Sequence, residues 1–242
     1  MFYVGVDGCK KGWFAVKLPE RNDWEINLFP NIKELWQQYK DANLILIDIP
    51  IGLPHRAHKV RSCDTEARKL LVERRSSVFP VPCRRAVWSD NYKDYEKVSK
   101  INKEETGRGL SLQTFGIIPK IREVDQFLSD NVSARSRIRE IHPEVCFWAL
   151  NDKRPMEYSK KNEKGIQERK SILMSVYPDS EGIFEDAERN LRKEVARDDI
   201  LDALVAAVTA YKGRQGLKSI PEKPELDSHG LPMEMIYFLS AK

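Results

Sequence analysis

Three short apolar runs open the chain, and their alternation of apolar and polar positions predicts strands. The first run ends in an acidic residue, Asp7, and then turns on Gly8 and Gly12, which permit tight backbone turns. Further strands are predicted over residues 13–18 and 24–29. Because the connections between these runs are short, we expect the three strands to form a meander.

A helix and a buried strand are predicted next. Asn31 is placed to cap a helix that extends to about Lys40 and carries its apolar residues on one face. The run from Asn43 to Pro50 is almost continuously apolar, which is typical of a strand buried on both faces, and it contains Asp48 near its end. The pattern predicts a mixed α/β sheet in which two strands carry an aspartate near the carboxyl end.

The sheet pattern then stops for a long segment, residues 52–138, whose pattern is mostly helical. Pro119 should bend the last helix of this segment. We therefore predict one domain, residues 1–242, that contains the segment as a basic helical insertion. The helices predicted within it cover residues 61–75, 92–105 and 111–128.

Strand alternation returns at residues 139–147, where Pro143 indicates an edge or a bulge. The strongest helical pattern of the chain spans residues 198–210. A last strand, residues 235–239, follows a proline-rich loop. Two further helices are predicted at residues 162–175 and 184–195.

Composition supports a soluble globular protein, with 41% hydrophobic and 32% charged residues in a chain of 242. No apolar run approaches the roughly 18 residues of a membrane span, and the first residues carry no signal-peptide pattern. Four cysteines are scattered without a C-x-x-C pair, which favours reduced thiols. We expect a cytoplasmic protein without a membrane partner.

Positive charge is concentrated in one part of the chain. The net charge is +4, but residues 55–85 hold nine Lys or Arg against three acids, a local excess of +6 that leaves about −2 elsewhere. Such an excess is typical of a surface that binds a polyanion. Three arginines recur every seven residues and would share a helix face, and three lysines lie in the first turn or beside Pro119. The predicted substrate-binding residues are Lys10, Lys11, Arg61, Arg68, Arg75 and Lys120.

Acidic residues recur near the predicted strand ends and at the start of the last helix. At about 100° per residue, Asp202 lies on the flank of the apolar stripe of that helix and Asp199 about 60° beyond it. Carboxylates gathered in this way repel one another unless a cation lies among them, and Mg²⁺ or Mn²⁺ prefers such oxygen ligands. Two such ions would support an in-line phosphoryl displacement. The predicted catalytic acids are Asp7, Asp48, Glu144, Asp199 and Asp202, of which Asp7, Asp48 and Asp202 are the metal ligands.

The same residues also allow structural interpretations, and other motifs can be compared with them. Each aspartate taken singly could be a capping or turn residue. The histidines and cysteines His55, His58, Cys63 and Cys83 match no compact zinc spacing. Neither a P-loop nor a dinucleotide-binding glycine motif is present.

Several stretches together resemble a family of largely uncharacterised proteins described as predicted nucleases. They are GVDGCKKGW, IDIPIGLP, RSCDTEAR, RRSSVFPVP, GLSLQTFGIIPKIREVD, IHPEVCFWAL and DDILDALVAA. The last helix is also similar to that of the Holliday-junction resolvases. The resemblance implies a ribonuclease H-like fold, with a mixed five-stranded sheet flanked by helices, and a metal-dependent nuclease site.

Carried over onto this chain, the resemblance implies acids at Asp7, Asp48, Asp199 and Asp202. Resolvase-like members commonly have Glu where this chain has Asp48, and Glu144 has no standard counterpart.

Three functional hypotheses follow. The first is a two-metal nuclease acting on DNA or RNA. The second is nucleotide binding or phosphotransfer of the actin-like kind, although actin-like proteins usually duplicate the domain that this chain has once. The third is a non-catalytic nucleic-acid-binding module. The sequence is compatible with a homodimer.

Overall fold

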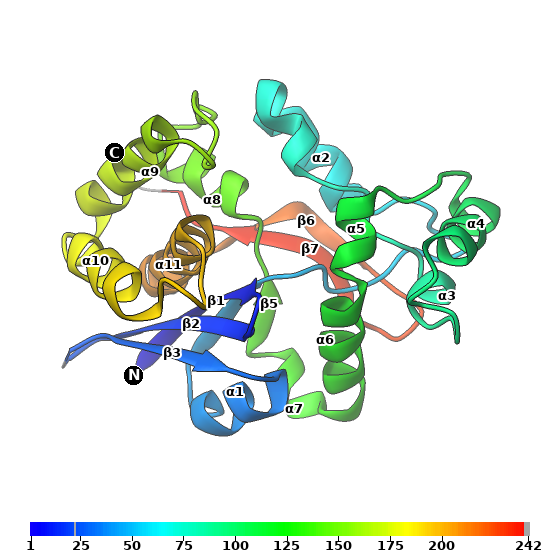
Figure 1. Cartoon of the computed structure of the whole chain (residues 1–242), viewed down its shortest axis with the longest axis horizontal. Helices are drawn as coiled ribbons and strands as arrows, with labels where there is room; N and C mark the ends of the chain where they lie inside the picture. The colour runs from blue at the N-terminus through cyan, green and yellow to red at the C-terminus, as the bar shows by residue number, and fades with distance from the viewer. Residues whose placement is uncertain (22, 240–242) are drawn as a thin grey trace.

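The computed structural model describes residues 1–21 and 23–239 and contains a five-stranded sheet between helices, together with a two-stranded sheet (Figure 1). The order in the larger sheet is β3-β2-β1-β4-β5. This is the mixed α/β architecture that the sequence predicts. The strands are β1 (Phe2–Cys9), β2 (Gly12–Pro19), β3 (Glu25–Phe29), β4 (Leu44–Asp48), β5 (Ile138–Glu140), β6 (Lys218–Leu226) and β7 (Pro232–Tyr237).

The first three strands form the predicted antiparallel meander, while β4 pairs with β1 and β5 with β4 in parallel. Parallel strands end at the same edge of a sheet. The register of β1 and β4 places Asp7 directly opposite Asp48. The topology therefore brings the two predicted strand-end acids together.

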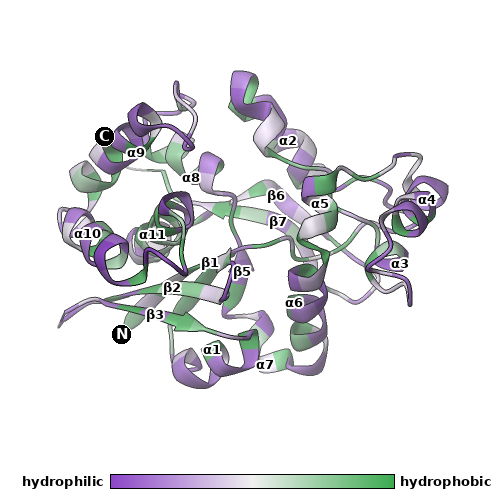
Figure 2. Ribbon diagram, viewed as in Figure 1, coloured by the Kyte–Doolittle hydropathy of each residue, from purple (hydrophilic) through white to green (hydrophobic). Residues whose placement is uncertain are grey.

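Helices cover both faces of the larger sheet, and each face has its own apolar core. Residues of α8 (Pro143–Leu150), α9 (Glu163–Val176), α10 (Ser180–Leu191) and α11 (Arg197–Lys212) pack on one face, and residues of α1 (Ile32–Tyr39) and α6 (Ile118–Asp130) on the other (Figure 1). Figure 2 shows that β2 and β3 are largely hydrophobic, whereas α4 (Tyr95–Thr106), remote from the sheet, is mainly hydrophilic. Among the helices described, none has the combination of length and apolar character needed to span a membrane.

The helices differ in length, and the longest is the one with the strongest predicted pattern. They are α1 (Ile32–Tyr39), α2 (Ser62–Leu71), α3 (Arg84–Val87), α4 (Tyr95–Thr106), α5 (Leu112–Gly116), α6 (Ile118–Asp130), α7 (Val132–Arg135), α8 (Pro143–Leu150), α9 (Glu163–Val176), α10 (Ser180–Leu191) and α11 (Arg197–Lys212), with 3₁₀ turns η1 (Val72–Ser77) and η2 (Gly213–Gln215).

The contact between α11 and β1 is unusually close. A Cβ atom at Gly5 would lie 2.0 Å from the backbone nitrogen of Ala207 and 2.1 Å from the carbonyl oxygen of Ala203. Only glycine allows backbone atoms of a strand and a helix to approach so closely. The small side chains on α11 complete this contact, which fixes the helix over the middle of β1.

Two predicted helices of the insertion have different boundaries. The helix predicted to reach residue 75 ends at Leu71, because Val72 adopts a positive φ of 43° and the chain continues as η1. The prediction that Arg61, Arg68 and Arg75 share one helix face is therefore wrong. Similarly, the helix that Pro119 was expected to bend is two helices, α5 and α6, and the proline lies in the first turn of α6, where its missing N–H has no consequence.

The strand predicted at residues 139–147 is wrong beyond its first residues. Only Ile138–Glu140 is a strand, and α8 begins at Pro143. Proline favours the first helical turn, and the eight residues of α8 are all buried, so no polar face reveals the helical period. Glu144 consequently lies in the first turn of a helix and not on a strand.

The proline-rich loop predicted before the last strand contains strand β6, which pairs with β7. Pro221 and Pro224 lie within β6. They are tolerated because β6 has a strand partner on one side only and its register with β7 is irregular between Ile220 and Glu225.

Gly5→Ala should destabilise the fold by about 3 kcal/mol or more, since the added methyl group meets backbone atoms that cannot rotate away. Urea denaturation measures the change. Gly182→Ala is the matched control: nothing lies within 4 Å of a Cβ at this α10 position, and alanine there should stabilise by about 0.5–1 kcal/mol. Equal stability of the Gly5→Ala variant and the wild type would show that the close contact is not a constraint.

Candidate functional site

The candidate site lies at the carboxyl ends of β1 and β4. Asp7 and Asp48 occupy paired positions in the parallel register. Since side chains alternate along a strand, these acids lie on the same face as Tyr3 and Leu44, which belong to the core beneath α11. The Asp7 carboxylate also accepts a hydrogen bond of 2.7 Å from the backbone N–H of Gly8.

Helix α11 adds two further predicted acids. Asp202 is 2% exposed, and Asp199 is partly buried in the first turn, where its carboxylate accepts a 3.3 Å hydrogen bond from the N–H of Ala196. Both lie on the helix segment before Ala203, the residue that touches Gly5. The close packing of α11 on β1 thus carries these acids toward the strand ends.

Burial and mutual repulsion disfavour the charged forms of these acids. Burial raises the pKa of Asp7 well above its ordinary range, and the neighbouring charges of Asp48 and Asp202 raise it further. Burial and Asp202 do the same to the pKa of Asp48. The pKa of Asp199 rises to about 6, again mainly through burial. Four acids therefore form one electrostatic cluster, which we call the acidic cluster: Asp7, Asp48, Asp199 and Asp202.

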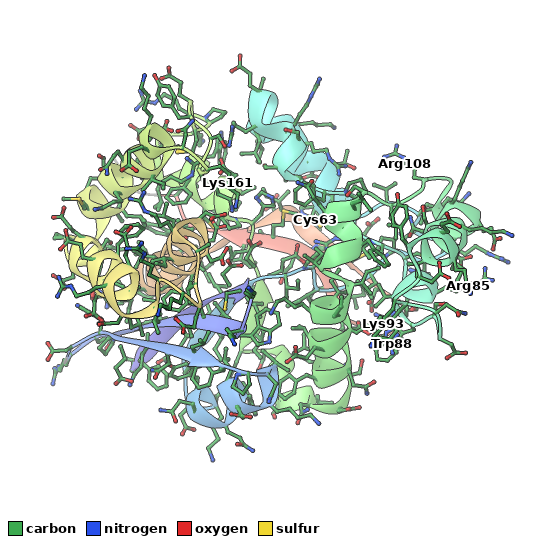
Figure 3. All side chains as sticks on the ribbon, viewed as in Figure 1. Cys63, Arg85, Trp88, Lys93, Arg108 and Lys161 are labelled. Carbon is green, nitrogen blue, oxygen red and sulfur yellow. The ribbon has the colours of Figure 1, made fainter. Side chains whose placement is uncertain are left out.

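A lysine that the sequence did not single out neutralises part of the acidic cluster. The ammonium group of Lys160 donates a hydrogen bond to Asp202 Oδ2. Burial alone would lower the pKa of Lys160, but the charges of Asp202, Asp48 and Asp7 outweigh burial and raise it. The adjacent Lys161 pairs with Asp198, and in Figure 3 it lies between α9 and α2.

Glu144, the fifth predicted acid, is held by arginines. It is 4% exposed, and its Oε1 accepts a 2.5 Å hydrogen bond from Arg169. Arg74 Nε lies 3.7 Å from Glu144 Oε2, which forms an ion pair without a hydrogen bond. The charge of Glu144 acts on Asp202 by raising its pKa, after the larger effect of burial. Glu144 therefore borders the acidic cluster from α8.

A cavity of about 320 Å³ opens beside the acidic cluster. Asp7 and Asp48 line it from the sheet, and Glu144 from α8. Four cationic side chains of the described residues line it as well, from α6, from η1 and from the loop before α9: Lys120, Arg74, Lys160 and Lys161. Acids that can hold cations and bases that can hold anions thus face the same space.

The six predicted substrate-binding residues do not all lie at this cavity. The described residues that line it include Lys120 but none of the other five predicted contacts. Lys120 donates a 2.5 Å hydrogen bond to the carbonyl oxygen of Gly12 and lies 4.3 Å from the ring centroid of Trp13. Burial lowers the pKa of Lys120.

Arg61 is fully buried and cannot serve as a surface contact for phosphate. It pairs with Glu140 at 2.5 Å and with Asp64 at 3.3 Å. Arg68 donates two hydrogen bonds, of 3.1 and 2.8 Å, to the carbonyl oxygen of Val78. Arg75 is exposed on η1, and Lys10 and Lys11 are exposed in the turn after β1.

Sequence reasoning missed Arg74, Lys160 and Lys161. Arg74 was counted in the basic excess but had no periodic relation to the other arginines. The two lysines precede Asn162, whose side chain caps α9 by accepting from the N–H of Gly165. Adjacent lysines before a capping residue are an ordinary surface pattern, so only their contacts with α11 distinguish them.

The donor chemistry of the acidic cluster suits Mg²⁺ or Mn²⁺, which bind carboxylate oxygens. Within the described residues, Asp202 Oδ1 is buried without a hydrogen-bond partner, as an unused ligand atom would be. In the same part of the chain, no three acidic, histidine or cysteine side chains converge closely enough to hold one ion as they stand. The residue types therefore fit a divalent metal, while the Lys160 ammonium group now compensates Asp202.

Asp48→Asn should stabilise the protein at pH 8. Because the pKa of Asp48 is raised in the folded state, wild-type stability falls as pH rises above the ordinary aspartate pKa of about 4 toward the folded value. The amide carries no such penalty, so the melting temperature should exceed that of the wild type by about 2–5 °C at pH 8. The difference should shrink toward pH 4.

Melting temperatures measured by circular dichroism from pH 4 to pH 8 test this expectation. Asp41→Asn, at an exposed position, serves as the control and should change little at any pH. A variant no more stable than the wild type at pH 8 would contradict the repulsion within the acidic cluster.

Comparison with known proteins identifies a family. The family described as "Protein of unknown function (DUF429)" matches residues 5–226, which include every residue of the acidic cluster. No curated protein and no solved structure matches the chain. Because the match extends from β1 to the end of β6, this chain belongs to the DUF429 family.

Proposed function

We propose that this protein is a metal-dependent nuclease that hydrolyses phosphodiester bonds of nucleic acid. The observation that carries the proposal is the pairing of Asp7 with Asp48 on adjacent parallel strands, with Asp202 supplied by the packed helix α11. A cavity lined by cationic side chains adjoins these acids. An acidic cluster suits metal, and a cationic wall suits phosphate.

The fold supports the same proposal. The order β3-β2-β1-β4-β5, with acids at the ends of the two central strands and on the last long helix, agrees with the ribonuclease H-like arrangement that the sequence resembles. Agreement of fold alone would not imply function, because one fold carries many activities. Here the acids themselves occupy the expected elements.

Each group has a distinct role in the proposed reaction. Asp7, Asp48 and Asp202 would hold Mg²⁺ or Mn²⁺. When bound, such an ion lowers the pKa of water and stabilises negative charge on phosphoryl oxygens. Arg74 and Lys161, which line the same cavity, would orient the phosphodiester. Asp199, with its pKa near 6, can accept or donate a proton at neutral pH.

We further propose that the protein works in a reducing compartment. All four cysteines are free and buried: Cys9, Cys63, Cys83 and Cys146. This supports a cytoplasmic location.

A second candidate is a protein that binds a nucleotide or small phosphate without cleaving a polymer. The observation that favours it is Lys160, which already compensates Asp202 and leaves fewer free carboxylate charges for metal. Metal-dependent cleavage separates the two candidates.

Asp7→Asn should lower Mn²⁺-dependent cleavage at least about 100-fold, since even the loss of a group behind a metal ligand costs about 10–100-fold. The assay measures release of labelled fragments from a panel of single-stranded, duplex and junction DNA and RNA. Asp41→Asn, purified in the same way, is the control for contaminating nucleases and should retain full activity. Unchanged cleavage by the Asp7→Asn protein would refute the assignment of Asp7.

Lys160→Met should make the fold depend more strongly on divalent metal. Without the ammonium group the acidic cluster is uncompensated, so the metal-free melting temperature should fall by about 2–5 °C. In this variant Mn²⁺ does not have to displace a lysine from Asp202. The Mn²⁺ concentration that gives half-saturation should therefore drop about tenfold relative to the wild type. Melting curves across a Mn²⁺ titration provide both values.

Lys161→Met is the matched control, because its partner Asp198 lies outside the acidic cluster and its side chain is 71% exposed. Its Mn²⁺ response should equal that of the wild type. If Mn²⁺ shifts neither the wild type nor the Lys160→Met protein, these carboxylates are not a metal site.

A further inference from the structure

The lining of the cavity beside the acidic cluster has two chemically different parts. The charged part includes Asp7, Asp48 and the cations Arg74, Lys120, Lys160 and Lys161. The apolar part, which we call the apolar wall, includes the segment after η1 with Val78, Phe79, Pro80 and Val81. A ligand that fills this space must therefore combine an anionic group with a flat or apolar one.

Phe79 is the exposed feature of the apolar wall. Phe79 is 38% exposed and lines the cavity, so part of its surface is open to a ligand there. Bases of single-stranded nucleic acid stack on aromatic side chains of this kind, and the stacking tolerates any base because each base has a π-face. The ring is thus available for a partner that the protein itself does not supply.

The backbone around Phe79 is fixed before any ligand arrives. The guanidinium group of Arg68 donates both of its short hydrogen bonds to the carbonyl oxygen of Val78. On the other side, the hydroxyl of Thr114 donates a 3.3 Å hydrogen bond to the carbonyl oxygen of Pro80. Anchors from α2 and α5 on either side of one residue hold the apolar wall in place, which reduces the entropy lost on binding.

The size of the cavity limits what can enter. Its volume of about 320 Å³ is near the lower end of ligand sites, which run from about 300 to 1,000 Å³. A base within a duplex is stacked and paired and cannot reach such a site without leaving the helix. The space suits one nucleotide and not a double helix.

We propose that this cavity takes a single nucleotide of an unpaired strand, with the base against Phe79 and the phosphate between the acidic cluster and the cations Arg74 and Lys161. The location of the scissile phosphate rests on the proposed nuclease function, while the base site rests on the apolar wall alone. Single-stranded DNA or RNA, or an unpaired end of a duplex, is then the substrate class. Arg68 is a positioning residue for the wall.

The test compares the wild type with Phe79→Ala and Phe79→Trp in Mn²⁺. Its substrates are a labelled single-stranded oligonucleotide, the same sequence as a blunt duplex, and bis(p-nitrophenyl) phosphate, a diester without a base. A nucleoside monophosphate is titrated by calorimetry as a separate binding probe. Leu112→Ala is the matched control, because Leu112 is 70% exposed and does not line the cavity.

We expect single-strand cleavage at least about tenfold faster than duplex cleavage, because unpairing a duplex base costs a few kcal/mol. Phe79→Ala should lower kcat/KM on the single strand by about 5- to 150-fold, which corresponds to about 1–3 kcal/mol of stacking per base. The same variant should cleave the base-free diester at the wild-type rate. Phe79→Trp should preserve single-strand cleavage, and Leu112→Ala should resemble the wild type.

The possible failures are distinguishable. Equal cleavage of duplex and single strand, without an effect of the Phe79 substitutions, would overturn the base site. The nuclease function would then still stand. An equal loss on the base-free diester would also overturn the base site, since the change would then be structural. Nucleotide binding that depends on Phe79 without any cleavage would support the base site and refute the nuclease function. If the protein shows no nucleotide binding and no cleavage, the base site and the nuclease function are both refuted.

Discussion

The close packing of α11 on β1 is the constraint on which the candidate site depends. Gly5 has no side chain, and the facing helix presents Ala203, Ala206 and Ala207, so the two backbones meet at distances that any Cβ on the strand would prevent. The helix can therefore lie low over the sheet and extend its first turns past the strand ends. That position carries Asp202 to Asp7 and Asp48. A larger residue at Gly5 would lift the helix and separate its acids from those of the sheet.

Buried charge in this protein is balanced by partners from distant parts of the chain. Arg61, directly before α2, meets Glu140 of β5, Arg169 of α9 meets Glu144 of α8, and Lys160 meets Asp202. A buried ion pair contributes little net stability, but losing one partner leaves an expensive unpaired charge. The acidic cluster is the exception, since among the described residues only Asp202 of its four acids forms an ion pair, with Lys160. Such local frustration is expected where a site is kept for function at the expense of stability.

The basic excess of residues 55–85 has a different meaning in the structure than in the sequence. Arg61 and Arg84 neutralise acids inside the molecule, the latter through Asp125 and Asp227. Arg85 is exposed and in Figure 3 lies at the end of the molecule near α3, away from Lys161. The segment contributes Arg74 and the apolar wall around Phe79 to the cavity. A charge count therefore overstates how much of this segment can face a polyanion.

The sequence by itself determined the central sheet and the acids at its edge. Strong alternation in the first strands, the continuous apolar run that ends near Asp48 and the long pattern of the last helix are local signals, and each produced the predicted element. Only the tertiary structure decided the identity of α8, the existence of β6 and the cations at the site. Because every residue of α8 is buried, its sequence shows no helical alternation of apolar and polar residues. The prolines of β6 are acceptable only because one edge of this strand is unpaired. Lys160 and Arg74 depend on contacts across the fold, which no local pattern encodes.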